Sequence, residues 1–420
     1  MPSSPDRRLL ARRLASDWVP PRLLRAVAAR HPVAPDRAAP DRAAPDRAAP
    51  TGRASSTTEP AARAAGAVPD QVVEDDPRWA RMTERVLTEL AECDPAYRPT
   101  NFWGPALDQL LGDLDSMGLS RFKRWPRAGF WFLPLYGNGF SNLTIRQTFR
   151  RAKNVNPAAR RQYVTAALNG SLQAHRDFDA ARLAWDQARW PADLDGLGES
   201  RIGEPWQHYR LIPNRPDLGF GRAYLNYMLV MAGLSRHVET PPRSFLELGG
   251  GFGALGEFVM SRDPEARYLN LDIPPLVTVS SYYLTELFGH ERVLTYGPQV
   301  PASGPLEVPR SACLPNWRIE DISGPLDVFV NTYSFQEMEP DVVENYVARV
   351  ASLGVHYVAS LNSLAGKPVA TQTGAIGVLD QVTSPRIITM FEKRGYQLVA
   401  TYQRPLLNTA AELAILRRAQ

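Results

Sequence analysis

The spacing of hydrophobic residues changes near residue 244. Beyond this point, short apolar runs alternate with longer segments in which apolar residues recur every three or four positions. The first pattern predicts strands and the second predicts helices. We expect strands at 244–248, 268–272, 292–296, 326–331, 356–361, 396–402 and 412–416, with helices at about 253–262, 275–288, 340–352 and 384–394.

A mainly parallel α/β sheet follows from this alternation, because helices that join parallel strands cover both faces of the sheet. The last two predicted strands follow each other without a helix between them. They therefore predict an antiparallel hairpin that ends the sheet.

The preceding part of the chain has helical spacing. Segments 76–118 and 160–189 repeat apolar residues every three or four positions, and the apolar stretch 224–234 predicts a buried helix. An aromatic-rich block lies at 122–140. We expect a mostly helical substrate-binding or lid domain over residues 69–235, followed by an α/β domain over residues 236–420.

Residues 1–68 lack the apolar residues that a core needs. Three copies of Ala-Pro-Asp-Arg-Ala occupy residues 34–48, and a proline at every fifth position prevents helix and sheet formation. We expect a disordered, basic, proline-rich tail. Short basic amphipathic stretches at 7–14 and 23–30 leave contact with a membrane surface or a partner open.

Composition narrows the class of protein. The formal net charge of the 420 residues is only +4, which gives no case for a nucleic-acid partner. No run reaches the roughly 18 apolar residues of a membrane span, so we expect no integral membrane segment. Cys93 and Cys313 form no CxxC pair, which favours a cytoplasmic protein without a disulfide framework or zinc site. Nothing in the composition indicates the oligomeric state.

A glycine-rich segment follows the first predicted strand. Gly249, Gly251 and Gly253 form a GxGxG pattern, and residues without side chains let the backbone approach a ligand closely. Asp272 ends the next strand, 21 residues after Gly251, where an acid can accept both hydroxyls of a ribose. This arrangement predicts S-adenosylmethionine (SAM) as the cofactor. Glu247 is expected to act on its amino-acid end, directly or through water.

Three further residues are expected beside the cofactor. Ile273 follows Asp272 and is expected to line the adenine slot. Asp321 precedes the strand at 326–331 and is placed to meet the adenine amino group. Asn331 ends that strand, at the same edge of the sheet.

Two alternatives compete for the glycine segment. Gly251, Gly253 and Gly256 also fit the GxGxxG pattern of dinucleotide-binding proteins, and the spacing of Asp272 suits NAD. That interpretation leaves Gly249 and Gly250 unexplained. It also does not fit the terminal hairpin, which is the usual ending of the SAM methyltransferase sheet. In the second alternative, the glycines only serve a tight turn between strand and helix.

Three strings resemble sugar O-methyltransferases of the nanchangmycin deoxysugar type, which are found in antibiotic gene clusters. They are FLELGGGFG at 245–253, LNLDIP at 269–274 and DVFVNTYSFQEM at 327–338, of which the last is the most specific. The resemblance covers roughly residues 95 to 405. It implies a Rossmann-like SAM methyltransferase sheet, a role in antibiotic biosynthesis or other secondary metabolism, and methyl transfer to a hydroxyl of a sugar or glycosylated small molecule.

A sugar hydroxyl is a poor nucleophile at neutral pH and benefits from a general base. Glu337 is the first candidate base, because it follows the strand at 326–331, and Ser334 and Gln336 are expected to hydrogen-bond the substrate. The alternative role for Glu337 is to stabilise the start of the next helix. His208 is the second candidate, in a loop expected to cover the site, although a lone histidine can be an ordinary polar residue.

No metal is predicted, because the neighbouring acids Glu337, Glu339 and Asp341 lack a recognisable ligand spacing. Lys367 lies in a loop at 362–383 and either closes over substrate or is solvated. Two other functions stay open. One is a SAM enzyme that methylates a non-sugar small molecule, and the other is a non-catalytic accessory protein with this fold.

Overall fold

The structure is a computed structural model that describes residues 76–137, 150, 156–190, 196–372, 375–403 and 410–419. Apart from residue 150, these residues belong to one unit made of Val73–Asn138 and Asn154–Gln420. The predicted tail, residues 1–68, lies outside the described residues.

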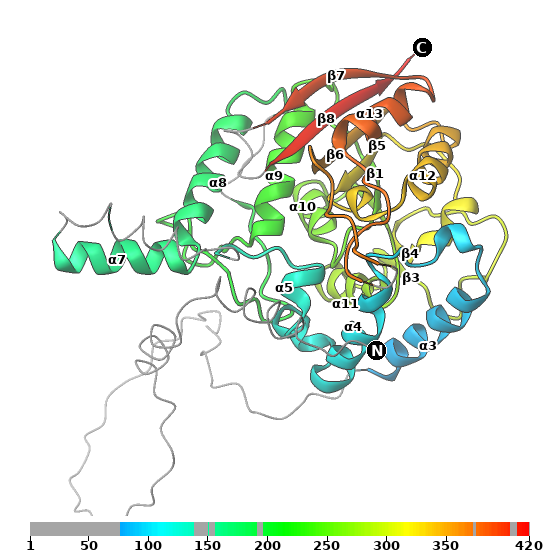
Figure 1. Ribbon diagram of the computed structural model, residues 1–420, viewed down its shortest axis with the longest axis horizontal. Coiled ribbons are helices and arrows are strands. Elements are labelled where there is room, and N and C mark those ends of the chain that lie inside the picture. The colour runs from blue at the N-terminus through cyan, green and yellow to red at the C-terminus, as the bar shows by residue number, and fades with distance from the viewer. Residues whose placement is uncertain are drawn as a thin grey trace, which may run out of the picture. The chain divides into compact units, whose positions relative to one another are not determined.

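One sheet of eight strands organises the described chain (Figure 1). The strand order is β3-β4-β2-β1-β5-β6-β8-β7. Strands β1 to β6 all pair in parallel, whereas β8 lies antiparallel between β6 and β7. The predicted α/β fold with a terminal antiparallel hairpin is confirmed. The strands are β1 (Ser244–Leu248), β2 (Arg267–Asp272), β3 (Val293–Thr295), β4 (Ser311–Pro315), β5 (Val328–Thr332), β6 (Tyr357–Ser363), β7 (Tyr396–Tyr402) and β8 (Ala411–Arg418).

Strand β4 was not among the predicted strands. All five of its residues are buried, but Ser311 and Pro315 bracket an apolar stretch of only Ala-Cys-Leu. A stretch this short shows no measurable hydrophobic periodicity, and a proline at its end makes a strand less expected. The strand predicted at 326–331 is therefore the fifth in the chain, and the segment before it holds a strand of its own.

Helices pack on both sides of the strands (Figure 1). Every residue of α9 after Arg222 is buried, which confirms the buried helix predicted from the apolar run. Helix α10 packs between α9 and α11, and α12 packs against α13. These helices are α9 (Arg222–Ser235), α10 (Ala254–Arg262), α11 (Leu276–Phe288), α12 (Pro340–Ser352) and α13 (Ser384–Glu392).

The N-terminal part is helical but more interrupted than its periodicity predicts. The segment 76–118 contains prolines at 95 and 99, and a helix interior cannot accommodate them. The segment 160–189 breaks at Gly170, where φ is +84° and a Cβ atom would lie 2.3 Å from the Cβ of Tyr136. The helices are α3 (Pro77–Glu92), α4 (Gly104–Met117), α5 (Ala128–Trp131), α7 (Pro157–Leu168) and α8 (Ser171–Trp185), with 3₁₀ turns at Pro95–Tyr97 and Leu119–Arg124.

A buried ion pair in the N-terminal part lies against the turn that follows β1. The Lys123 ammonium lies 2.6 Å from the Glu199 carboxylate, and both side chains are almost fully buried. The same ammonium lies 4.6 Å from the ring centroid of Phe252, in the turn after β1. Nearby, Tyr283 donates a hydrogen bond to Glu257, whose pKa burial raises to about 7. Buried charges need such partners, so this cluster stabilises the turn after β1, which contains Phe252.

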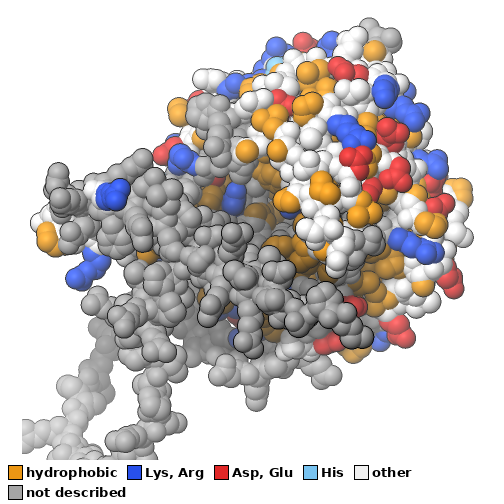
Figure 2. All heavy atoms as spheres, in the orientation of Figure 1, with side chains coloured by type: hydrophobic (Ala, Val, Ile, Leu, Met, Phe, Trp, Pro, Cys, Tyr) orange, Lys and Arg blue, Asp and Glu red, His pale blue; other side chains and the backbone are white. Residues whose placement is uncertain are grey.

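The surface is mixed in charge. Basic and acidic side chains are interspersed over the described part of the face seen in Figure 2. Among the described helices, none is long and apolar enough to cross a membrane.

Candidate functional site

A pocket opens where β1, β2, β4 and β5 end. Its volume is about 310 Å³, and pockets that bind small ligands usually measure about 300–1,000 Å³. In a parallel sheet this carboxyl edge is where ligands bind. The lining residues come from several elements. They are the glycine turn 249–252, Asp272, Ile273, Asn316, Tyr346, Arg222, Asn226, Tyr227, Trp103, Val342 and Lys367, and the segments 98–100, 129–134, 332–334 and 336–338, among others.

The glycine turn brings bare backbone to the pocket. Gly249, Gly251 and Gly253 have φ values of +69°, +59° and +93°, a region that side chains disfavour. A Cβ at Gly249 would lie 2.2 Å from the Ser334 hydroxyl oxygen. Gly251 borders the pocket, and the nearest atom to its would-be Cβ is the Phe132 carbonyl oxygen at 3.6 Å. Gly253 does not line the pocket, since it caps α10 and packs against Leu284.

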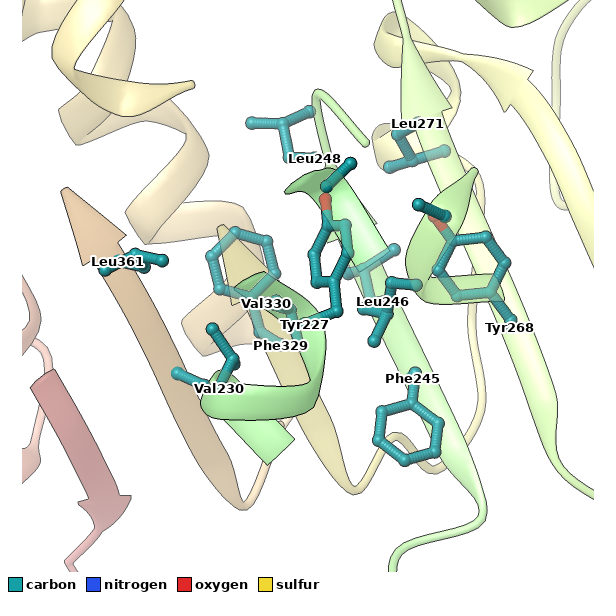
Figure 3. Packing of buried hydrophobic residues seen from close by; sticks show 14 of the residues in the cluster. Tyr227, Val230, Phe245, Leu246, Leu248, Tyr268, Leu271, Phe329, Val330 and Leu361 are labelled. Carbon is teal, nitrogen blue, oxygen red and sulfur yellow. The ribbon is translucent and has the colours of Figure 1, made fainter. Parts of the chain in front are cut away.

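Glu247 lies behind this turn and does not line the pocket. Its carboxylate accepts hydrogen bonds from the hydroxyls of Tyr227, at 2.7 Å, and Tyr268. Figure 3 shows these two tyrosines beside strand β1. Burial raises the pKa of Glu247 to about 7. Of the two tyrosines only Tyr227 lines the pocket, so it is the hydrogen-bond partner of Glu247 that a ligand there can contact.

This cluster also explains Gly250. A Cβ there would lie within 2.6–2.7 Å of the Asn270 and Glu247 side-chain oxygens and the Tyr268 hydroxyl. The Gly250 N–H donates to the Asn270 side chain at 3.2 Å. Three consecutive glycines are therefore required, two by their φ angles and one by the carboxylate behind it.

Asp272 lines the pocket at the end of β2. Its two carboxylate oxygens accept hydrogen bonds of 2.8 Å from the N–H groups of Gly251 and Ile273. Burial nevertheless raises the pKa of Asp272 to about 8. The predicted position of Asp272 beside the glycine turn agrees with the structure, and Ile273 lines the pocket next to it.

Asp321 does not line the pocket. It forms a 2.9 Å ion pair with Arg318, outside the pocket wall. Asn316, which follows β4, lines the pocket instead and is almost fully buried. Its amide nitrogen donates to the Tyr97 carbonyl and the Tyr346 hydroxyl, both at 2.7 Å. Its side-chain oxygen has no hydrogen-bond partner among the described residues, and a buried acceptor of this kind calls for a donor from a ligand or water.

Asn331 is a structural residue behind the pocket wall. Its amide donates to the Leu248 carbonyl at 3.1 Å, and its oxygen accepts from the Phe335 N–H and the Asn362 amide. These bonds join the ends of β1, β5 and β6. Asn331 thereby supports the turn that carries Tyr333, where φ is +64°, an uncommon value for a residue with a side chain.

Ser334, Gln336 and Glu337 all line the pocket. The Gln336 side-chain oxygen accepts the Ser363 N–H at 2.6 Å, which orients its amide. One Glu337 oxygen lies 2.8 Å from the Lys367 ammonium, and the other accepts the Trp103 indole N–H at 3.0 Å. Burial raises the pKa of Glu337, and Lys367 opposes that rise. The carboxylate therefore faces the pocket and Lys367, and Glu339 rather than Glu337 is the residue at the cap of α12.

His208 lies away from the pocket lining. One ring nitrogen is 2.7 Å from the Glu199 carbonyl oxygen, and the ring packs against Gly219. Burial lowers its pKa. Within the described residues, no group of three or more His, Cys, Asp or Glu side chains is arranged to hold a metal ion.

Several pocket residues were not predicted from the sequence. Asn316 follows the strand that periodicity missed, and Arg222, Asn226 and Tyr227 belong to a helix whose apolar run predicts only burial. The aromatic-rich block was recognised without a role, yet residues 129–134 form one wall of the pocket. Lys367 is paired with Glu337 and only 27% exposed, rather than solvated.

Comparisons with known proteins give similar folds but no close relative. No family model matches the chain, and no curated protein matches it. Among solved structures, the mitomycin 7-O-methyltransferase MmcR is 16% identical over 83% of this chain and 74% of its own, with a TM-score of 0.33. The pyocyanin biosynthetic protein PhzM is 14% identical over 81% of this chain and 99% of its own, with a TM-score of 0.32.

A third similar structure is the magnesium protoporphyrin IX methyltransferase ChlM from Synechocystis PCC 6803, with bound SAM. It is 13% identical over 47% of this chain and 79% of its own, with a TM-score of 0.33. At such identities and TM-scores, the function has to be argued from the chain's own site.

The buried carboxyl of Asp272 makes stability depend on pH. Its pKa of about 8 lies above the ordinary value of 3.8, so near neutral pH the folded protein holds a proton that the unfolded chain has released. This carboxyl's contribution to the free energy of unfolding therefore falls as the pH rises from about 4 to about 8. Between about pH 5 and pH 8, we expect the thermal midpoint of Asp272→Asn to fall less than that of the wild type, as measured by calorimetry.

Asp217→Asn is the matched control. Asp217 is exposed, and hydrogen bonds from Arg215 lower its pKa, so this variant should keep the wild-type difference between the two pH values. If Asp272→Asn also keeps that difference, Asp272 does not titrate as its burial requires.

Proposed function

We propose that this chain is a SAM-dependent methyltransferase that methylates a sugar hydroxyl of a natural product. One observation carries the proposal. The glycine turn, Asp272 and the unpartnered oxygen of Asn316 stand at the ends of three strands and line one pocket together with the Glu337 carboxylate. This is a nucleoside-binding edge with a candidate base beside it.

The residues present fit SAM along its length. The Gly249–Gly251 backbone permits close approach of the cofactor, and Asp272 offers carboxylate oxygens to the ribose hydroxyls. Asn316 offers its oxygen to the adenine amino group, so it takes the role predicted for Asp321. Arg222, Asn226 and Tyr227 line the pocket from one face of α9 and supply polar partners for the amino-acid end.

The same contacts disfavour a dinucleotide cofactor and a purely structural role. Gly249 and Gly250, which the GxGxxG pattern leaves unexplained, have defined roles in the turn. A turn that served only packing would not need a buried oxygen of Asn316 without a hydrogen-bond partner or the strongly raised pKa of Asp272.

SAM, when bound, supplies a methyl group on a sulfonium, an excellent leaving group. Glu337 would accept the proton of the acceptor hydroxyl on a carboxylate oxygen as that hydroxyl takes the methyl group. Lys367 and Trp103 hold both oxygens of that carboxylate in place, and Ser334 and Gln336 orient the acceptor. Positioning of the acceptor beside the methyl group supplies the remainder of the rate.

The sugar acceptor is supported by the resemblance of residues 327–338 and by the polar side chains that this string places in the pocket. The acceptor itself can be found by incubating the enzyme with SAM and extracts of a producing strain. A mass gain of one methyl group on a glycosylated compound would support the proposal, whereas the same gain on a compound without sugar would favour a non-sugar acceptor.

Asn316 should determine selectivity for the adenine amino group. We expect Asn316→Leu to weaken S-adenosylhomocysteine binding by about 1–3 kcal/mol, the cost of a lost hydrogen bond to a buried group. Calorimetry with S-inosylhomocysteine, which lacks the amino group, should show that the variant loses the wild-type preference for adenine.

Asp321→Asn is the control for this experiment, because Asp321 is paired with Arg318 outside the pocket. It should retain the adenine preference. Loss of preference in Asp321→Asn but not in Asn316→Leu would restore the assignment predicted from the sequence.

Glu337 should be needed for the chemical step. We expect Glu337→Gln to bind S-adenosylhomocysteine normally and to lower the methylation rate by ~10²–10⁴, the usual range for a general base. In Lys367→Met, the pKa of Glu337 should rise further because a nearby cation is removed. The acidic limb of the pH–rate profile should therefore shift to higher pH. Near-normal turnover by Glu337→Gln would rule it out as the base.

A further inference from the structure

An aromatic wall extends from the candidate base to the rim of the pocket. Its members are Phe102, Trp103, Phe130 and Trp131. Trp131 lies 5.4 Å from Trp103 and 4.7 Å from Phe130, measured between ring centroids. Phe102 packs edge-on against both tryptophans at 5.5–6.2 Å. Such spacings are those of favourable aromatic pairs, so the wall is one packed unit.

The two ends of the wall differ in their surroundings. At the inner end, the Trp103 indole N–H donates to Glu337. The Lys367 ammonium pairs with the same carboxylate and lies 4.6 Å from the ring centroid of Phe102. At the outer end, Phe130 is 60% exposed although it lines the pocket. Trp131 itself is 6% exposed, and its N–H is satisfied by Gln109. The wall thus runs from a polar reaction centre to an apolar surface in contact with water.

The charges of the pocket bear on the form in which a sugar arrives. A nucleotide-linked sugar carries a diphosphate, which would require cations with available donors. Among the described residues that line the pocket, Arg98 donates to the Ala91 and Cys93 carbonyls and Lys367 pairs with Glu337. Arg222 donates to the Leu135 carbonyl and is one of the residues proposed above for the cofactor's amino-acid end. Each of these three cations therefore already uses at least one donor within the protein, and of the three only Lys367 is paired with a carboxylate.

From these observations we propose that the acceptor is a finished glycoside, whose sugar lies at Glu337 and whose apolar, preferably aromatic, aglycone packs on the Phe130 end of the wall. This inference rests on the proposed function and specifies its substrate class. Aromatic faces stack on the C–H face of a sugar and on planar rings alike, so one wall serves both parts of the ligand. The class of reaction that supplies the substrate is accordingly a glycosyl transfer onto the aglycone before methylation.

Three probes distinguish the forms of the acceptor: 1-naphthyl β-D-glucopyranoside, methyl β-D-glucopyranoside and UDP-glucose. Each is titrated into the full-length protein by calorimetry, with and without saturating S-adenosylhomocysteine. We expect the naphthyl glycoside to bind at least about tenfold tighter than the methyl glycoside, since about 1.4 kcal/mol of stacking suffices for tenfold. UDP-glucose should bind no better than the methyl glycoside.

Phe130→Ala tests whether the wall provides this preference. Phe130 is exposed, so its removal should spare folding and S-adenosylhomocysteine affinity while reducing the naphthyl preference at least about fivefold. Trp206→Ala is the matched control, because Trp206 is an aromatic residue that is 67% exposed and lies outside this pocket's lining. It should leave the preference unchanged.

Three results would overturn the inference: tighter binding of UDP-glucose than of the naphthyl glycoside, no measurable binding of the naphthyl glycoside, or a preference that survives Phe130→Ala. These results are separable from failure of the proposed function. A protein that binds the naphthyl glycoside through Phe130 but does not bind S-adenosylhomocysteine would retain the wall and lose the methyltransferase assignment.

Discussion

The site depends on how closely the backbone after β1 can approach the pocket, and a buried carboxylate sets that distance. Glu247 accepts hydrogen bonds from Tyr227 and Tyr268. Its carboxylate, the Tyr268 hydroxyl and the Asn270 side chain fill the space behind Gly250. Because no side chain fits there, the turn lies directly on the cluster and presents the Gly251 backbone to the pocket. A charge buried this deeply is retained only when its oxygens are satisfied, which the two hydroxyls achieve.

The same principle recurs at the other side of the pocket. Glu337 has one oxygen on Lys367 and the other on Trp103, so its position is fixed before any acceptor binds. The hydrogen bonds to Asp272 in the described residues come from backbone N–H groups and not from a cation. Burial therefore raises its pKa strongly. Groups that are incompletely compensated in the free protein mark positions where a ligand supplies the missing interactions. The unpartnered oxygen of Asn316 belongs to the same class.

The sequence predicted the local parts of this account well. Strand β1, the glycine turn and Asp272 lie within thirty residues of one another, and their spacing predicts that Asp272 lies beside the glycine turn, as it does in the structure. The terminal hairpin was predictable because no helical pattern separates its strands. The short strand β4 was not predicted, because a proline ends a three-residue apolar stretch. Asn316, which follows β4, was therefore also not predicted, and Asp321 was predicted for the contact with the adenine amino group instead.

Contacts between distant segments could not be predicted. Lys367 pairs with Glu337, which precedes it by thirty residues, and Trp103 donates to Glu337 from more than two hundred residues away in the sequence. Neither contact produces a periodic pattern in the sequence. Likewise, Asn331 looks like a cofactor residue from its position at a strand end, but long-range packing turns it toward Leu248 and Asn362. His208 resembles a catalytic residue in a loop, whereas its ring is held by the Glu199 carbonyl.

The central claim is that this pocket binds SAM through the turn after β1 and Asp272. Its most direct test is calorimetric titration of S-adenosylhomocysteine and of NADH into the wild-type protein and into Asp272→Ala. The account predicts binding of S-adenosylhomocysteine, a loss of about 1–3 kcal/mol in the variant, the cost of leaving a buried polar group unpaired, and no heat from NADH. Tight binding of NADH together with no binding of S-adenosylhomocysteine would contradict it.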